Sequence, residues 1–192
     1  MRKKLSVNFF DRPTTAVARD LLGKHLVRRW QGKELALLIT EVEAYDGPHD
    51  RASHASRGKT ERTRIMFGPA GRFYVYFTYG MHWLVNVVTG PKEYPAAVLI
   101  RAGRYYDAGT RTWIGLNGPA RLTKFLHIGK AQNGKAAKPE NGLWLEDRGT
   151  TIAKKNITAS KRIGVDYAGP IWKNKLYRFS IIEDRPRTET GS

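Results

Sequence analysis

Cysteine is missing from this chain of 192 residues, and its absence excludes several kinds of site. The chain can form no disulfide, offers no thiolate nucleophile and cannot build a zinc site from cysteines. Long hydrophobic runs are missing too. No stretch approaches the roughly 20 apolar residues that span a bilayer, and the basic start lacks the apolar segment of a secretory signal. We therefore expect a cytoplasmic protein that does not act on a membrane.

Acidic residues are scarce relative to basic ones. The sequence has 34 Lys and Arg against 17 Asp and Glu, which gives a formal net charge of +17 and an isoelectric point near 10.3. Small soluble domains usually carry a net charge of only about 2–8, so an excess of this size favours a polyanionic partner. Because no stretch has the long apolar face of a membrane-surface helix, the charge favours a nucleic acid.

The hydrophobic pattern predicts a single α+β domain over residues 9–182, between polar, flexible ends at 1–8 and 183–192. Helices are expected after Asp11, as an N-terminal cap, and after Pro119. Strands are expected at 25–30, 35–45, 73–79, 82–88, 96–102, 143–147 and 177–182. They should form a mainly antiparallel sheet with helices packed at its edges. Residues 46–72 have little hydrophobic period and are predicted to be a long loop.

Carboxylates interrupt the apolar strand predicted at 35–45, in the stretch ITEVEAYDG. Strand alternation puts Glu41, Glu43 and Tyr45 on one face, with Val42 and Ala44 on the other. One interpretation is an ordinary solvated strand end, since exposed glutamates are common. The other is a cleft, in which a partly dry carboxylate beside an aromatic wall would serve as a general base.

The next stretch, DGPHDRASHAS, contains four residues that could bind a metal ion: Asp46, His49, Asp50 and His54. A metal-dependent nuclease that combines Asp46, His49 and Asp50 with Glu43 is one hypothesis. However, the spacing matches no helical His-x3-His pair, so metal ligation is the weaker interpretation. His54 could equally be a hydrogen-bonding surface residue or stack on a planar ligand.

A hairpin is predicted from FYVYFTYGMHWLVN at 73–86. Tyr74 and Tyr76 share one face, and we expect Val75 and Phe77 on the opposite face to enter the core. Asn86 is unusual within its apolar strand, because a buried amide needs hydrogen-bond partners. It is a candidate for discriminating a ligand by shape or by its polar edge.

The tip of this hairpin is apolar where turns are normally polar, since Tyr79 and Met81 flank its glycine. Arg101 is also unusual, because it is a charged residue at the end of the apolar run AAVLI. Its guanidinium could brace a carboxylate or contact a phosphate, or could be an ordinary charge at a strand end.

Several stretches together resemble the alkyladenine, or 3-methyladenine, DNA glycosylase family. They run in the family's order from about Phe9 to about Phe179. The stretches are FFDRPTTAVARDLLGKHLVRR, ITEVEAYDGPHDRASHASRGKTERTRIMFGPAGRFYVYFTYGMHWLVNVV, AAVLIRA, NGPARLTKFLHI, LWLED and RIGVDYAG. The sequence EVEAY, the following H-A-S, YVYFTYGM, the asparagine and LIRA are specific in this combination.

The resemblance implies hydrolysis of the N-glycosidic bond of damaged purines in double-stranded DNA, the first step of base excision repair. It implies a single mixed domain built on a curved antiparallel sheet, without a metal ion or organic cofactor. Glu43 would be the general base and Arg101 would help to position the attacking water. The implied base-binding residues are Tyr45, His54 and Tyr76, which sandwich the flipped base, and Asn86, which guards the pocket against normal guanine.

At the DNA surface, the resemblance implies that Tyr79 intercalates, with Met81 beside it. The chain departs from the common family pattern at His82 and Trp83, and at Ala120 and Arg121 after NGP, which bears on affinity and fine specificity. We expect a cytoplasmic monomer, associated with the nucleoid if the source is a prokaryote. The alternative hypothesis is a basic nucleic-acid-binding protein without catalysis, which would leave Glu43 in an apolar strand unexplained.

Overall fold

A computed structural model describes residues 2–182 and has the predicted α+β class. The helices are α1 (Val7–Phe10), α2 (Thr14–Leu21), α3 (Pro119–Phe125) and α4 (Gly169–Lys173). The strands are β1 (Lys3–Lys4), β2 (His25–Trp30), β3 (Lys33–Tyr45), β4 (Phe73–Thr78), β5 (His82–Val88), β6 (Ala97–Asp107), β7 (Thr112–Asn117), β8 (Leu143–Asp147), β9 (Ile157–Ser160) and β10 (Arg178–Ile181). The predicted tail at 183–192 lies outside the described residues, whereas the predicted flexible start includes β1 and part of α1.

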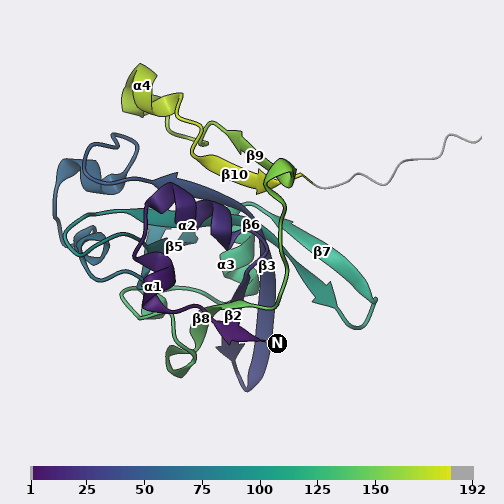
Figure 1. Ribbon diagram of the computed structural model, residues 1–192. Coiled ribbons are helices and arrows are strands. Elements are labelled where there is room, and N and C mark those ends of the chain that lie inside the picture. The colour runs from purple at the N-terminus through teal and green to yellow at the C-terminus, as the bar shows by residue number, and fades with distance from the viewer. Residues whose placement is uncertain (1, 183–192) are drawn as a thin grey trace, which may run out of the picture.

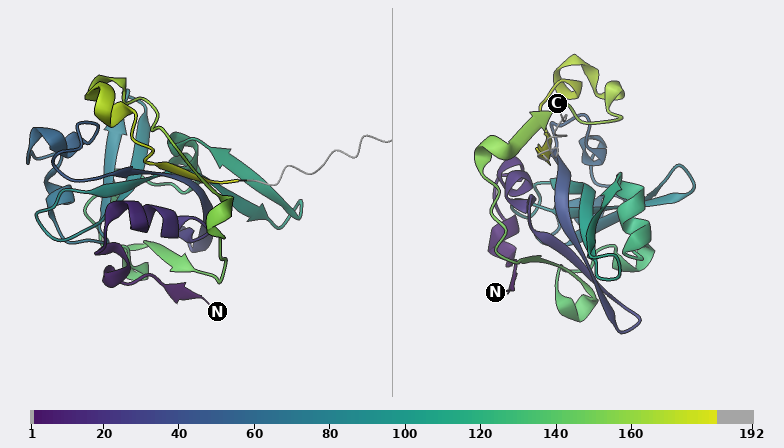
Figure 2. Two further views of the ribbon diagram at one scale, coloured as in Figure 1. Left: turned by 45° about the horizontal axis from the view of Figure 1, so that its top comes forward. Right: turned by 90° about the vertical axis from the view of Figure 1, so that its right-hand side faces the viewer.

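All strands join one curled antiparallel sheet in the order β1-β8-β2-β3-β6-β5-β4, with β7 attached to β6 and the β9–β10 pair attached to β3 (Figures 1 and 2). The long strand β3 changes partners along its length. Its first half pairs with β2, and residues 41–43 pair with β10. On its other side, residues 38–45 of β3 pair with β6. The carboxylates therefore lie where β2 diverges from β3 and β10 replaces it.

Two β-bulges interrupt the pairing of β3 with β6 at this point. Ile39 pairs with Gly103, Glu41 with Ala102 and Val42 with Ile100. Thr40 and Arg101 are therefore the unpaired residues of the two strands. A bulge bends its strand and changes the direction of a side chain. Here it brings the guanidinium of Arg101 to the carboxylates of β3, 2.9 Å from Glu41 and 3.4 Å from Glu43.

The core lies between the concave side of the sheet and helix α2, whose Val17, Ala18 and Leu21 are fully buried. Strand alternation sends Val42 and Ala44 into this core, as predicted. The predicted cap of α2 is wrong. Asp11 ends the short helix α1, and Pro13 precedes the first turn of α2.

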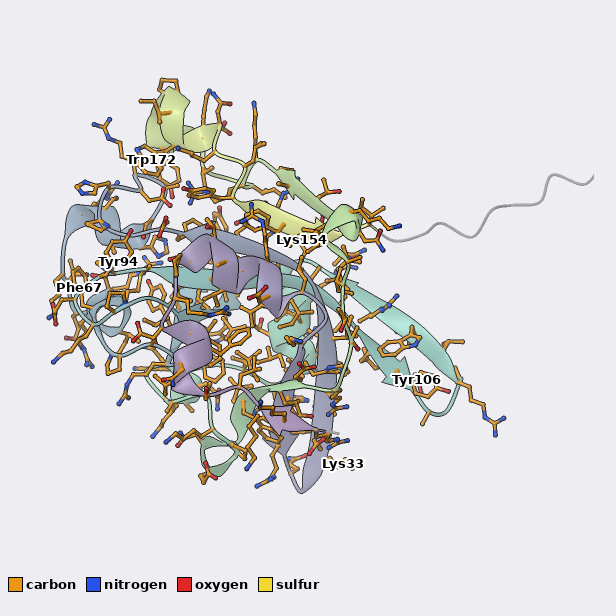
Figure 3. The ribbon with its side chains drawn as sticks, viewed as in Figure 1. Lys33, Phe67, Tyr94, Tyr106, Lys154 and Trp172 are labelled. Carbon is orange, nitrogen blue, oxygen red and sulfur yellow. The ribbon has the colours of Figure 1, made fainter. Side chains whose placement is uncertain are left out.

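Strand β7 was not predicted from the sequence. It forms a ribbon with β6 that projects beyond the rest of the sheet (Figure 1). Tyr106 lies on this ribbon (Figure 3) and is half-exposed, as is its cross-strand neighbour Trp113. None of the side chains of β7 is buried, and its apolar Trp113 lies on the exposed face, so the hydrophobic alternation is weak. At the base of the ribbon, Tyr105 stacks on Phe125 of α3 with ring centroids 4.2 Å apart. Within residues 2–182, none of the helices has the length and apolar character needed to cross a bilayer.

Candidate active site

A cavity of about 350 Å³ opens beside the bulged part of β3 and β6. This volume falls in the range of small-molecule sites. Most of its wall comes from five segments. They are β3 with Tyr45, the 46–57 segment with His54, the β4–β5 hairpin with Tyr76 and Asn86, β6 with Arg101, and the 161–168 segment with Ile163 and Tyr167. The N-terminus of α3 also lines it, through Pro119 and Ala120. Tyr79 lines the mouth of the cavity.

Glu43 is 0% exposed and lies behind the cavity wall. Its Oε2 accepts a hydrogen bond of 2.8 Å from the Tyr45 hydroxyl, and its Oε1 accepts one of 2.8 Å from the backbone N–H of Ile163. Burial raises the pKa of Glu43 above its ordinary value, against the opposing effects of Arg101 and of these two donors. The solvated strand end considered for this residue is therefore wrong, since Glu43 is fully buried next to the cavity.

Arg101 links the two glutamates of β3, as the sequence suggested for a brace between carboxylates. Its Nε donates to Glu41, and its Nη1 lies 3.4 Å from Glu43. Glu41 is in turn 3.5 Å from Arg178 of β10. These ion pairs keep the guanidinium of Arg101 in one orientation at the cavity.

Three rings form one wall of the cavity. His54 Nδ1 is 3.0 Å from the Tyr74 hydroxyl, and the His54 and Tyr76 ring centroids are 4.7 Å apart. Tyr74 and Tyr76 share a face, as predicted, with centroids 5.3 Å apart. Burial, together with nearby Arg62 and Arg57, lowers the pKa of His54 to about 4. At neutral pH this wall therefore presents uncharged rings to the cavity.

Asn86 is buried in β5, directly opposite Tyr74 of β4. Its Nδ2 donates a 3.0 Å hydrogen bond to the Tyr74 carbonyl. This bond satisfies part of the amide's hydrogen-bonding capacity and fixes the side chain in the wall of the cavity. The fixed amide thereby limits the shape of a molecule that can enter.

The hairpin tip holds apolar side chains in water. Tyr79 is 85% exposed and Met81 is 67% exposed. Tyr79 and Gly80 both have positive φ, 51° and 66°, and Met81 N–H bonds to the Thr78 carbonyl. This turn geometry favours Asn-Gly, and a tyrosine in it is strained. The expected core position of Phe77 is wrong, since it is 46% exposed and packs against Trp83 near the tip.

The four candidate metal ligands after β3 do not assemble. Both Asp50 carboxylate oxygens pair with Arg162, and Asp50 also accepts hydrogen bonds from the N–H groups of Asp46 and Ala52. In the part of the chain that the structure describes, no three His, Cys, Asp or Glu residues are grouped to hold a metal ion. Asp50, one of the ligands required by the nuclease hypothesis, is therefore occupied in an ion pair.

The 161–168 segment, which the sequence pattern did not mark as part of the site, lies against Glu43 in the structure. Ile163 and Tyr167 line the cavity while remaining 52% and 66% exposed. The signal available in the sequence was limited to the apolar Ile163 and the aromatic Tyr167 in the short glycine-containing stretch RIGVDYAG. Its position against β3 depends on contacts with residues more than a hundred positions away.

Comparison with known proteins gives one consistent result. Residues 8–185 match the family model of the methylpurine-DNA glycosylases. The chain is 46% identical over 173 residues to a protein from Methanocella arvoryzae, covering 84% of each chain. It is 43% identical to one from an Anaeromyxobacter species, with 93% of this chain and 89% of the relative covered. It is also 43% identical to one from Streptomyces avermitilis, with 95% and 90% covered. All three relatives carry the name "Putative 3-methyladenine DNA glycosylase".

Proposed function

The chain belongs to the methylpurine-DNA glycosylase family, and from that premise we propose that it extrudes alkylated or deaminated purines from double-stranded DNA and releases them with a water activated by Glu43. The substrates are of the 3-methyladenine, 7-methylguanine and hypoxanthine class. The observation that carries the proposal is the fully buried Glu43, which accepts two hydrogen bonds and pairs with Arg101 next to an aromatic cavity.

Glu43 has the geometry of a general base. A carboxylate offers about four acceptor positions, and Tyr45, Ile163 and Arg101 face three of them. The remaining position accepts a hydrogen bond from water. As the sugar gains oxocarbenium character, the water oxygen bonds to C1′, its proton passes to Glu43, and the glycosidic electron pair leaves with the purine. Arg101 orients the water from β6.

The rings bind the extruded base. Alkylation at N3 or N7 gives a purine a positive charge, and electron-rich rings hold such a base by stacking and cation–π attraction, worth about 1–3 kcal/mol per stacked face. Tyr45 lies on one side of the base, and His54 and Tyr76 on the other. Because the pKa of His54 is about 4, this residue is neutral at pH 7 and does not repel a cationic purine. Asn86 restricts entry of normal guanine.

Tyr79 fills the gap left in the duplex by the extruded base, with Met81 beside it. An exposed ring on a strained turn is unfavourable in water, but it is suited to a base stack. The net charge of +17 supports binding to the DNA backbone and makes that binding dependent on salt.

Base release without metal tests this function. Methylated duplex DNA incubated with the protein and excess EDTA should lose free alkylated purines, identified by chromatography and mass spectrometry. The phosphodiester backbone should stay intact until the abasic sites are cleaved with alkali. Absence of any released base, or strand cleavage that EDTA abolishes, would contradict the proposal.

The rate of base release should rise with pH across the mildly acidic range. Glu43 accepts a proton only when ionised, and its raised pKa places the midpoint above the ordinary glutamate value of about 4.3. Single-turnover rates on a duplex carrying one alkylated purine measure this dependence. A rate that falls as pH rises through this range would show that the protonated carboxyl is the active form.

A further inference from the structure

Asp50 and Arg162 form a completely buried ion pair behind the cavity, with both side chains 0% exposed. Arg162 Nη2 donates to Asp50 Oδ1 over 2.8 Å, and Nη1 donates to Oδ2. The same guanidinium lies over the ring of Tyr45, with its carbon 4.8 Å from the centroid. Two charges buried this deeply lose their hydration, and a buried pair of this kind often adds no net stability compared with apolar residues.

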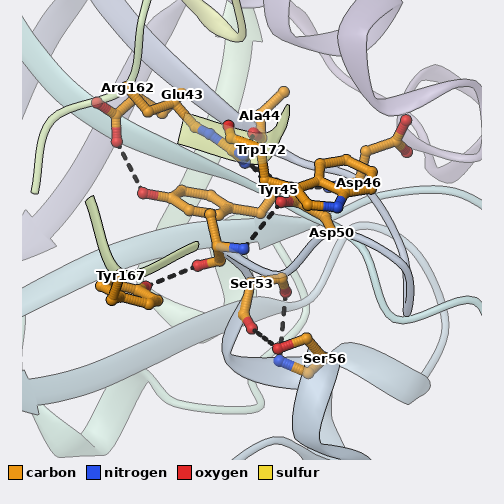
Figure 4. A network of polar contacts seen from close by, with 12 residues as sticks. Glu43, Ala44, Tyr45, Asp46, Asp50, Ser53, Ser56, Arg162, Tyr167 and Trp172 are labelled. Carbon is orange, nitrogen blue, oxygen red and sulfur yellow. Dashed lines mark hydrogen bonds and ion pairs between the residues drawn. The ribbon is translucent and has the colours of Figure 1, made fainter. Parts of the chain in front are cut away.

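The pair joins three walls of the cavity (Figure 4). Arg162 Nη1 also donates a 2.8 Å hydrogen bond to the carbonyl of Ala44, which lies between Glu43 and Tyr45 on β3. Asp50 accepts hydrogen bonds from Asp46 N–H and Ala52 N–H. These bonds fold the start of the segment that carries His54.

The third wall is the 161–168 segment itself. The residue after Arg162 is Ile163, whose N–H donates to Glu43 Oε1. Further along, the Tyr167 hydroxyl donates a 2.9 Å hydrogen bond to the Ala52 carbonyl. The segment is therefore anchored to the 46–57 segment at two points, and the N–H that touches Glu43 lies between them.

We propose that Asp50 and Arg162 are positioning residues for base release, because their ion pair holds the Ile163 N–H against Glu43 and fixes the one acceptor position left for the attacking water. This inference rests on the proposed function of Glu43. A displacement of about 1 Å at a reacting group can reduce a rate about 100-fold. The pair thus acts on the chemical step, and its contribution to lesion binding is small.

The experiment uses a double variant, because removing one charge alone would leave the other buried and unpaired. In Asp50→Asn/Arg162→Met, the asparagine oxygen keeps an acceptor for one of the two N–H groups, which bond to different oxygens of Asp50, and the methionine fills much of the arginine's volume. The control is Glu146→Gln/Arg148→Met, which removes another ion pair with a nearly buried carboxylate on β8, away from the cavity. Thermal unfolding and near-ultraviolet circular dichroism establish that both variants are folded.

The double variant is expected to release base about 100-fold more slowly in a single turnover. Its dissociation constant for a duplex carrying one alkylated purine should change less than about threefold. Hydrogen exchange should be faster in peptides covering residues 161–168, and this readout does not depend on activity. The control variant should keep the wild-type rate and the wild-type exchange of these peptides. A folded double variant with the wild-type rate would overturn the inference.

The pH profile separates positioning from a purely electrostatic effect. The groups facing Glu43 are Tyr45 on its own strand, Arg101 from β6, and Arg162 with the Ile163 N–H from the 161–168 segment. The double variant removes the charge of Arg162 and loosens the contact of the Ile163 N–H. Both changes favour the protonated form of Glu43, so the acidic limb of the pH profile should move to higher pH. The rate deficit should persist on the plateau above that limb. A deficit that disappears there would leave only a pKa effect and would refute positioning, whereas a wild-type protein that releases no base would refute the proposed function itself.

Discussion

The variant Glu43→Gln is expected to lose base release by about 10²–10⁴-fold, the usual contribution of a general base, while still binding lesion-containing DNA. The glutamine oxygen can keep the hydrogen bond from Ile163, and its amide can donate to the Tyr45 hydroxyl oxygen. The cavity therefore keeps its shape but lacks a group that accepts the water's proton. Single-turnover base release and equilibrium binding to the same duplex measure the two effects separately.

The stability of this variant provides a second measurement. Burial raises the pKa of Glu43, which means that ionisation of this carboxyl is unfavourable in the folded state, and Arg101 remains paired with Glu41 in the variant. The melting temperature at neutral pH should therefore not fall. Glu34→Gln, on the same strand but remote from the cavity, is the matched control and should keep the full rate. A variant at Glu43 that releases base at the wild-type rate would remove this residue from the mechanism.

The second large effect is expected from Tyr79→Ser, which should weaken binding to a lesion duplex much more than binding to undamaged DNA. A stacked ring contributes about 1–3 kcal/mol, so the dissociation constant for the lesion duplex should rise roughly 5- to 150-fold. Undamaged DNA is bound mainly through phosphate contacts, which the substitution leaves in place. Titrations of both duplexes at one salt concentration give the ratio.

Tyr106→Ser supplies the comparison for the wedge. Tyr106 is also an exposed tyrosine near the end of a two-stranded ribbon, but it does not line the cavity. Its removal should leave the ratio of lesion to undamaged binding unchanged. If Tyr79→Ser weakened both duplexes equally, Tyr79 would be a general DNA contact and the intercalation proposal would fail.

Local patterns in the sequence were enough to predict several parts of the site. The alternation of β3 placed Glu43 and Tyr45 on one face, and the structure joins them by a hydrogen bond. The hairpin signal placed Tyr74 and Tyr76 together, and the apolar tip marked Tyr79. The roles of these residues in binding and catalysis come from the family resemblance, and they stay predictions until the variants are measured.

Other features were beyond local patterns because they depend on contacts between distant segments. Phe77 was assigned to the core by alternation, yet it is 46% exposed because the hairpin extends past the core at that point. Asp50 was considered as a metal ligand from its neighbours, but its partner lies 112 residues away. The strand β7 was missed because none of its side chains is buried and its apolar Trp113 is exposed, which weakens the hydrophobic alternation.

The sequence by itself determined the strand faces, the charge and the family, because side-chain alternation, ionisable groups and motif order are properties of the chain and need no folding. Only the tertiary structure decided that Glu43 is buried, accepts two hydrogen bonds and pairs with Arg101. Burial depends on β6, β10 and the 161–168 segment closing around β3. The bulge that turns Arg101 toward the carboxylates likewise exists only when β3 and β6 pair out of register, which neither strand specifies alone.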